Sequence, residues 1–138
     1  MRTRSLLIVE DNIPLRQMLT LEFEELGYDV AMVGSCKEAM VWAERKPFDL
    51  ALLDYELPDG LGTELMTALQ KVQPHLRVLI CSANPSAEQA TAELGCATAF
   101  VHKPVGARML NRRFEAALDQ AHINATAVAA PGDTSNRS

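Results

Sequence analysis

The sequence of 138 residues lacks the features of membrane proteins, of secreted disulfide-rich proteins and of zinc-stabilised domains. No stretch approaches the roughly 20 apolar residues that a helix needs to span a membrane. The first apolar run, residues 6–9, stops at Glu10 and Asp11, well short of a signal-peptide core. The three cysteines show no CxxC spacing, so neither a disulfide framework nor a zinc site is predicted. We therefore expect a cytoplasmic protein with reduced thiols and no membrane partner.

Basic residues are also scarce. Lys and Arg number 13 against 18 Asp and Glu, which gives a formal net charge of -5. Nucleic-acid binding rests on many cationic contacts to phosphates, so direct binding to nucleic acid is not expected. The short Gly60-Leu61-Gly62 loop lacks the Walker signature and predicts no nucleotide site.

The residues that are present suit one globular domain. The chain is 48% hydrophobic and 22% charged, which is close to the average for soluble domains of this length. Helical periodicity stops near residue 121, and the remainder is rich in small polar residues. We therefore predict a domain over residues 1–121 and a flexible tail over 122–138.

Short apolar runs alternate with amphipathic stretches along the domain. The runs at 6–9, 30–33, 50–53, 78–81 and 97–101 predict strands that are covered on both faces, as in a parallel sheet. The stretches between them predict five helices, of which the Ala-rich fourth should pack least tightly. Asn12 and Pro14 should start the first helix, which ends at Gly27, and the capping box of Ser35 and Glu38 should start the second, which ends at Lys46. The third helix should cover residues 63–72. A second capping box, Ser86 and Gln89, should start the fourth, which ends at Gly95, and the last helix carries Leu110 and Phe114.

Polar residues follow the predicted strands where they end. Five alternating strands and helices predict a doubly wound α/β fold, in which ligands bind beyond the carboxyl ends of the strands. Glu10 and Asp11 follow the first strand, Asp54 the third, Ser82 the fourth and Lys103 the fifth. Three carboxylates at neighbouring strand ends would raise one another's pKa unless a cation joined them. The residues therefore indicate a site for Mg²⁺, which prefers oxygen ligands.

The same positions carry a resemblance to a known family. The segments Leu7-Ile8-Val9-Glu10-Asp11-Asn12, Asp54-Tyr55-Glu56-Leu57-Pro58-Asp59-Gly60, Ser82-Ala83 and Lys103-Pro104 are similar, in order and spacing, to the motifs of response-regulator receiver domains of two-component signalling. The resemblance covers residues 5–121. It implies a flavodoxin-like fold with a five-stranded parallel sheet in the order 2-1-3-4-5, as in chemotaxis regulators.

The resemblance also implies the metal ligands. Asp54 would accept a phosphoryl group and bind Mg²⁺, Asp11 would bind the ion directly, and Glu10 would reach it through water. The backbone carbonyl of Glu56 would complete the protein ligands.

The remaining implied roles concern switching. Ser82 and Lys103 would contact the phosphoryl group, and Phe100 would turn inward from a more exposed rotamer as Ser82 moves. The donor would be a phosphohistidine on a sensor histidine kinase or phosphotransfer protein. An output protein would dock on the face of the fourth helix, fifth strand and fifth helix. Such a protein is a signalling switch that catalyses only its own phosphorylation and dephosphorylation.

Two other functions fit the expected topology less well. A haloacid-dehalogenase-like phosphatase also uses an Asp at a strand end, but Glu56 stands where a second Asp would act as general acid. A flavodoxin-like flavin carrier needs a small polar phosphate loop after the first strand, where this chain has Glu10-Asp11-Asn12. The residues after 121 carry no pattern of an output domain, so we expect either a stand-alone regulator that acts by docking or a receiver cut from a longer protein. The position of Met1 just before the first strand favours the former, whereas the tail fits a severed linker equally well.

Overall fold

The computed structural model describes residues 3–95 and 99–116, and the statements below concern these residues. The predicted tail over 122–138, the beginning of the predicted fifth strand at 97–98 and the end of the predicted last helix lie outside them. Within the described ranges, no helix is both long and apolar enough to cross a lipid bilayer.

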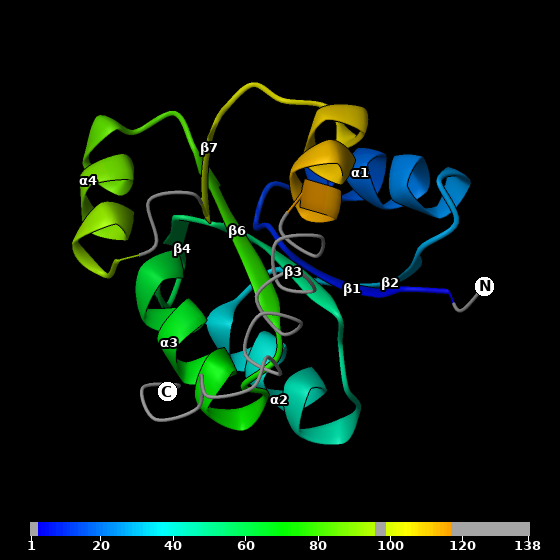
Figure 1. Ribbon diagram of the computed structural model, residues 1–138, viewed down its shortest axis with the longest axis horizontal. Coiled ribbons are helices and arrows are strands. Elements are labelled where there is room, and N and C mark those ends of the chain that lie inside the picture. The colour runs from blue at the N-terminus through cyan, green and yellow to red at the C-terminus, as the bar shows by residue number, and fades with distance from the viewer. Residues whose placement is uncertain (1–2, 96–98, 117–138) are drawn as a thin grey trace, which may run out of the picture.

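Five parallel strands form the central sheet (Figure 1). They are β1 (Ser5–Val9), β2 (Asp29–Val33), β3 (Leu50–Asp54), β6 (Arg77–Ser82) and β7 (Phe100–His102). Their order across the sheet is β2-β1-β3-β6-β7, which is the predicted order 2-1-3-4-5 in the structure's numbering. Two further strands, β4 (Glu56–Leu57) and β5 (Gly60–Leu61), pair antiparallel in a small separate hairpin. The sequence did not predict this hairpin, because two residues are too few to show a strand periodicity.

Helices cover both faces of the sheet (Figure 1). The elements are α1 (Ile13–Glu25), α2 (Cys36–Arg45), α3 (Gly62–Val72), α4 (Pro85–Glu93) and a C-terminal helix described over 107–116. Side chains of α1 and the C-terminal helix pack on one face, and those of α2, α3 and α4 pack on the other. The predicted doubly wound α/β architecture is therefore confirmed.

Strand β1 shows why the apolar runs are nearly continuous. Leu6 and Ile8 belong to the core below α1, whereas Leu7 and Val9 belong to the core below α2 and α3. All four are fully buried, since alternate side chains of a strand point to opposite faces and both faces are covered. Burial of each such side chain is worth about 1.5–3 kcal/mol.

Most of the expected helix ends are confirmed. The Asn12 side chain accepts from Leu15 N at 2.9 Å at the start of α1, and Ser35 Oγ accepts from Glu38 N at 3.2 Å at the start of α2. Gly27 ends α1 with a φ of 95°, in the left-handed region that favours glycine.

The predicted capping box of the fourth helix is wrong. The N-cap of α4 is Asn84, whose side chain accepts from Ser86 N at 2.9 Å. Pro85 has no N–H to satisfy and a fixed φ that suits the first helical position, so the capping residue is the one before it. Gly95 follows the helix with a φ of 77°, as predicted.

The expected loose packing of α4 applies to α2 as well. Helix α4 buries only Ala87 and Thr91, and Leu94 at its end is 48% exposed. Helix α2 buries only Ala39 and Ala43. The structure therefore gives both helices a small buried face and does not set α4 apart.

Candidate functional site

Three carboxylates meet where β1 and β3 end. The two strands are neighbours in register, with Val9 opposite Leu53, so the residues that follow them lie side by side. One carboxylate oxygen each of Glu10, Asp11 and Asp54 lies within 4.8 Å of the other two. The cluster that the sequence predicted is therefore formed.

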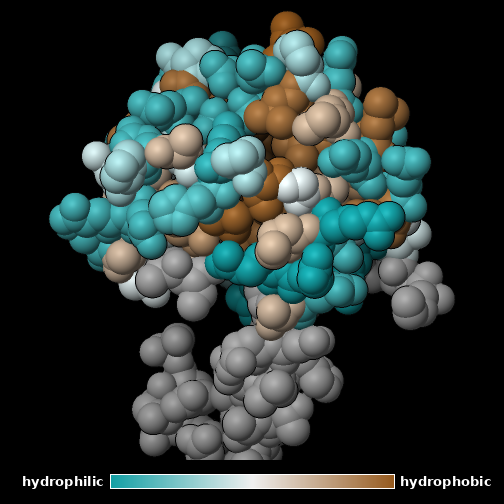
Figure 2. Space-filling model, turned by 90° about the horizontal axis from the view of Figure 1, so that it is seen from above, coloured by the Kyte–Doolittle hydropathy of each residue, from teal (hydrophilic) through white to brown (hydrophobic). Residues whose placement is uncertain are grey.

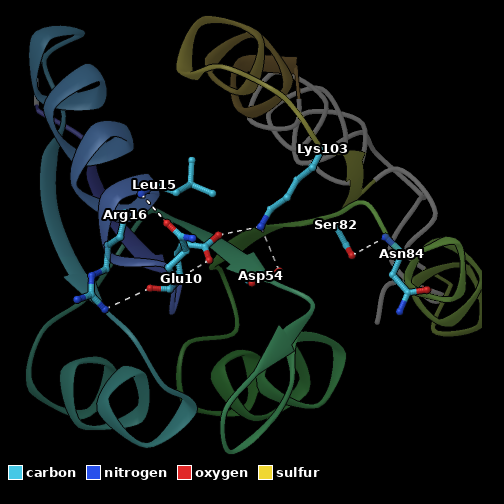
Figure 3. Close-up of polar contacts among 8 residues, drawn as sticks. Glu10, Leu15, Arg16, Asp54, Ser82, Asn84 and Lys103 are labelled. Carbon is cyan, nitrogen blue, oxygen red and sulfur yellow. Dashed lines mark hydrogen bonds and ion pairs between the residues drawn. The ribbon is translucent and has the colours of Figure 1, made fainter.

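Lys103 lies against this cluster from the loop after β7 (Figure 3). Its Nζ is 2.9 Å from Glu10 Oε1 and 3.4 Å from Asp54 Oδ1. The other Glu10 oxygen, Oε2, accepts from Asn12 N at 3.1 Å. Glu10 is buried and has a partner for each carboxylate oxygen, whereas Asp11 is exposed.

The electrostatics of the cluster depend on burial. Burial and the neighbouring Glu10 raise the pKa of Asp54 to about 6, against the opposing effect of Lys103. An apolar cavity of about 420 Å³ adjoins Glu10, Asp54 and Lys103, and its walls include Leu15, Met18, Leu52, Cys81 and Leu110. These apolar walls limit solvation of the Asp54 carboxylate, which favours its protonated form.

Lys103 itself stays charged. Burial alone would lower the pKa of Lys103, but its hydrogen bond to Glu10 and the charge of Asp54 outweigh burial, so the pKa lies above its usual value. The site therefore keeps a fixed cation beside Asp54 near neutral pH.

Ser82 lies at the end of β6, the strand next to β3. Its side chain is buried, and its Oγ accepts from Asn84 N at 2.9 Å (Figure 3). The backbone of Lys103 is tied to the same residue, since Lys103 N donates to Ser82 O at 3.0 Å. Glu56, whose carbonyl was predicted as a metal ligand, begins β4 with an exposed side chain.

Phe100 differs from the expectation. Its side chain is only 6% exposed, so the more exposed starting rotamer that the sequence suggested is wrong. The ring packs edge-on against His102, with 4.9 Å between ring centroids, and belongs to the core below α2, α3 and α4. His102 Nε2 lies 3.2 Å from Glu88 Oε1, which connects β7 to α4.

Sequence reasoning missed Arg16. Its Nη1 donates to the backbone carbonyl of Glu10 at 3.2 Å (Figure 3) and so helps to fix the loop after β1. A Cβ on Gly34 would lie 2.4 Å from the same nitrogen, so the guanidinium occupies the space that a side chain there would need. Only the placement of α1 beside the loop after β2 could reveal this contact, and no local pattern encodes it.

Comparison with known proteins identifies the family. The model of the response regulator receiver domain family matches residues 6–115. The chain belongs to this family.

Among curated relatives, response regulator protein PilR of Pseudomonas aeruginosa is 34% identical over 106 residues, which are 76% of this chain and 24% of PilR. The phosphate regulon transcriptional regulatory protein PhoB of the same species is 31% identical over 119 residues, 83% of this chain and 52% of PhoB. The receiver chain thus spans about a quarter to a half of these relatives.

Solved structures agree with this assignment. A CheY-like response regulator receiver domain protein from Methanospirillum hungatei JF-1 superposes with a TM-score of 0.79 at 26% identity, covering 89% of this chain and 99% of that one. A putative response regulator from Chloroflexus aurantiacus J-10-fl gives a TM-score of 0.74 at 26% identity, covering 86% and 99%. The flavodoxin-like receiver fold is confirmed, and the chain is a receiver domain of the two-component response regulators. The phosphatase and flavin-carrier alternatives receive no support.

Proposed function

We propose that this receiver domain accepts a phosphoryl group on Asp54 in a magnesium-dependent reaction. The observation that carries the proposal is the position of Asp54 at the end of β3, close to the carboxylates of Glu10 and Asp11 and 3.4 Å from the ammonium of Lys103. One nucleophile thus lies beside both a cation-binding cluster and a fixed positive charge.

The residues present fit Mg²⁺. The ion takes oxygen ligands and is commonly held by one or two carboxylates together with phosphate oxygens. Asp11, Asp54 and the Glu56 carbonyl would hold it directly, and Glu10 would act through water because Lys103 and Asn12 N already engage its oxygens. When bound, the ion supplies positive charge that offsets the mutual repulsion of the carboxylates and of the incoming phosphoryl oxygens.

The chemistry of the chain is that of an in-line phosphoryl transfer. A carboxylate oxygen of Asp54 attacks phosphorus, while the bond from phosphorus to the donor's imidazole nitrogen breaks and its electron pair stays on that nitrogen. Such a transition state needs positioning and charge stabilisation more than covalent assistance. The ammonium of Lys103 and the hydroxyl of Ser82 would bind two phosphoryl oxygens.

The signal would leave the domain by way of Ser82 and Phe100. Ser82 Oγ now accepts from Asn84 N at the start of α4, so a hydroxyl drawn toward a phosphoryl group would perturb this helix. Phe100 starts from a buried position, and its movement would change its contact with His102 and hence the link to Glu88. The output protein would dock on α4, β7 and the C-terminal helix.

The donor is a phosphohistidine on a sensor histidine kinase or phosphotransfer protein, and the receiver catalyses only its own phosphorylation and dephosphorylation. A reducing cytoplasm suits Cys36 and Cys81, which are free thiols.

The proposal is tested by incubating the full chain with acetyl phosphate and Mg²⁺ and following its intact mass. We expect one phosphoryl group to be gained, to be absent with EDTA, and to be released by hydroxylamine, which cleaves acyl phosphates. A modification that persists in hydroxylamine would lie on another kind of side chain and contradict the proposal. Absence of any gain would contradict it equally.

A further inference from the structure

Asp59 joins the hairpin after Asp54 to the start of α2. It lies in the turn between β4 and β5, and both of its carboxylate oxygens accept bonds from α2: Oδ1 from Cys36 N at 2.8 Å and Oδ2 from Lys37 N at 3.0 Å. The first N–H groups of a helix have no partner within the helix, so a carboxylate from elsewhere in the chain can satisfy them. These bonds hold the pKa of Asp59 below its usual value.

The base of the same hairpin is fixed on the Asp54 side. Gly62 N donates to Tyr55 O at 2.6 Å, and a Cβ on Gly62 would lie only 2.4 Å from Asp54 O. The backbone at Gly62 is therefore packed directly on the peptide of the proposed phosphoacceptor. Glu56 lies between this base and the tip that Asp59 holds, so its carbonyl depends on both attachments.

The start of α2 also adjoins the loop that carries Glu10. Gly34 immediately precedes the N-cap Ser35, and the guanidinium of Arg16 fills the space beside it while bonding to the Glu10 carbonyl. Strand β2 supplies no residue to the carboxylate cluster, yet the start of the helix that follows it binds the hairpin after Asp54, and Gly34 just before it adjoins the loop after β1. Helix α2 thus offers a common support for both sides of the site.

We propose that Asp59 is a positioning residue for the magnesium site. By fixing the hairpin tip to α2, Asp59 holds the Glu56 carbonyl in place. The inference rests on the proposed function, because it takes Asp11, Asp54 and the Glu56 carbonyl as the ligands. Mg²⁺ demands a nearly ideal octahedral geometry, so a displaced carbonyl costs affinity even when every ligand is still present. Residues that orient the ligands of a metal typically change affinity by about 10- to 100-fold.

Charge alone is the rival explanation. A carboxylate near the site attracts a cation without positioning anything, and the two effects respond differently to a longer side chain. Asp59→Glu keeps the charge but moves the carboxylate by one methylene, so it cannot preserve both short bonds to Cys36 N and Lys37 N. Asp29→Asn is a matched control, since it removes one negative charge at an exposed pair with Lys46 outside the cluster.

The test is calorimetric titration of the full chain with Mg²⁺, using the wild type, Asp59→Ala, Asp59→Asn, Asp59→Glu and Asp29→Asn. We expect Asp59→Ala and Asp59→Glu to weaken binding by about tenfold, Asp59→Asn to weaken it less, and Asp29→Asn to stay near the wild type. Amide exchange at Cys36 and Lys37 should accelerate in the same Asp59 variants.

Three outcomes would overturn the inference. Wild-type affinity in Asp59→Ala would show that the attachment has no effect on the metal, and wild-type affinity in Asp59→Glu together with a loss in Asp59→Ala would show an effect of charge alone. If Asp59→Ala does not fold, Asp59→Asn and Asp59→Glu carry the comparison, and wild-type affinity in both overturns it. Absence of Mg²⁺ binding by the wild type would instead refute the metal site of the proposed function itself.

Discussion

Lys103 lies closer to Glu10 than to Asp54, with its Nζ 2.9 Å from Glu10 Oε1 and 3.4 Å from Asp54 Oδ1. A phosphoryl group on Asp54 would place additional anionic oxygens within reach of this ammonium. Lys103 would then exchange part of its contact with Glu10 for the phosphoryl group, so the ion pair can respond to phosphorylation.

Replacement of the two phosphoryl-contacting residues should separate phosphorylation from the conformational response. Lys103→Ala and Ser82→Ala should leave Mg²⁺ affinity largely intact, because neither side chain is a proposed metal ligand. Both should reduce the change in amide exchange that phosphorylation causes in α4, and Lys103→Ala should reduce it more, since it removes a charge. A phosphorylated variant with the full wild-type exchange response would show that its residue has no switching role.

The raised pKa of Asp54 predicts an unusual dependence of stability on pH. The pKa is about 6 in the folded chain against an ordinary value of 3.8, so the folded chain holds more protons than the unfolded chain between these values. Ionisation of Asp54 should therefore lower the free energy of unfolding as pH rises from about 4 to about 6.

Urea unfolding of wild type and Asp54→Asn across this range, without Mg²⁺, measures the effect. The amide cannot ionise, so Asp54→Asn should be the more stable protein at pH 7, and the difference should shrink toward pH 4. Mg²⁺ should reverse the order at pH 7, because it binds the carboxylate. A stability difference that does not vary with pH would contradict the raised pKa.

The sequence could predict the sheet and the strand ends because both depend on local patterns. Apolar runs and the polar residues after them placed Glu10, Asp54, Ser82 and Lys103 near one edge, and the structure confirms that Lys103 meets Glu10 and Asp54 there. The sheet order came from the resemblance, since nothing in the residues of one strand specifies its neighbour.

The features that the sequence could not predict depend on contacts between distant segments. The bond of Arg16 to the Glu10 carbonyl and the bonds of Asp59 to α2 exist only when separate elements have packed. The burial of Phe100 follows from the packing of α4 on β7, which the pattern of residues near 100 does not reveal. The cap of α4 was missed for a local reason, since Pro85 favours Asn84 over Ser86.

The two carboxylates after β1 should differ in their effect on the metal. Asp11→Asn should weaken Mg²⁺ binding much more than Glu10→Gln. The Asp11 carboxylate is exposed and can bind the ion directly, whereas both carboxylate oxygens of Glu10 already have partners within the protein. The two substitutions remove the same charge and are therefore matched. Titration of both variants with Mg²⁺ decides the assignment, and equal or reversed losses would contradict it.

Phosphorylation should alter the α4 side of the domain more than the α1 and α2 side. Helix α4 buries only Ala87 and Thr91, so a shift there exposes little apolar surface, and Ser82 bonds directly to its N-cap residue. We expect amide exchange to change more in residues 83–95 and 99–104 than in 13–45. Helix α2 has an equally small buried face and serves as an internal control. Phe100→Ala should blunt the response while phosphorylation persists, and a change concentrated in 13–45 would show that the output face lies elsewhere.

The central claim is that Asp54 itself receives the phosphoryl group. The most direct measurement is the intact mass of wild type, Asp54→Asn and the charge-matched control Asp29→Asn after incubation with acetyl phosphate and Mg²⁺. Wild type and Asp29→Asn should each gain one phosphoryl group, and Asp54→Asn should gain none. Labelling of Asp54→Asn to the wild-type extent would contradict the account.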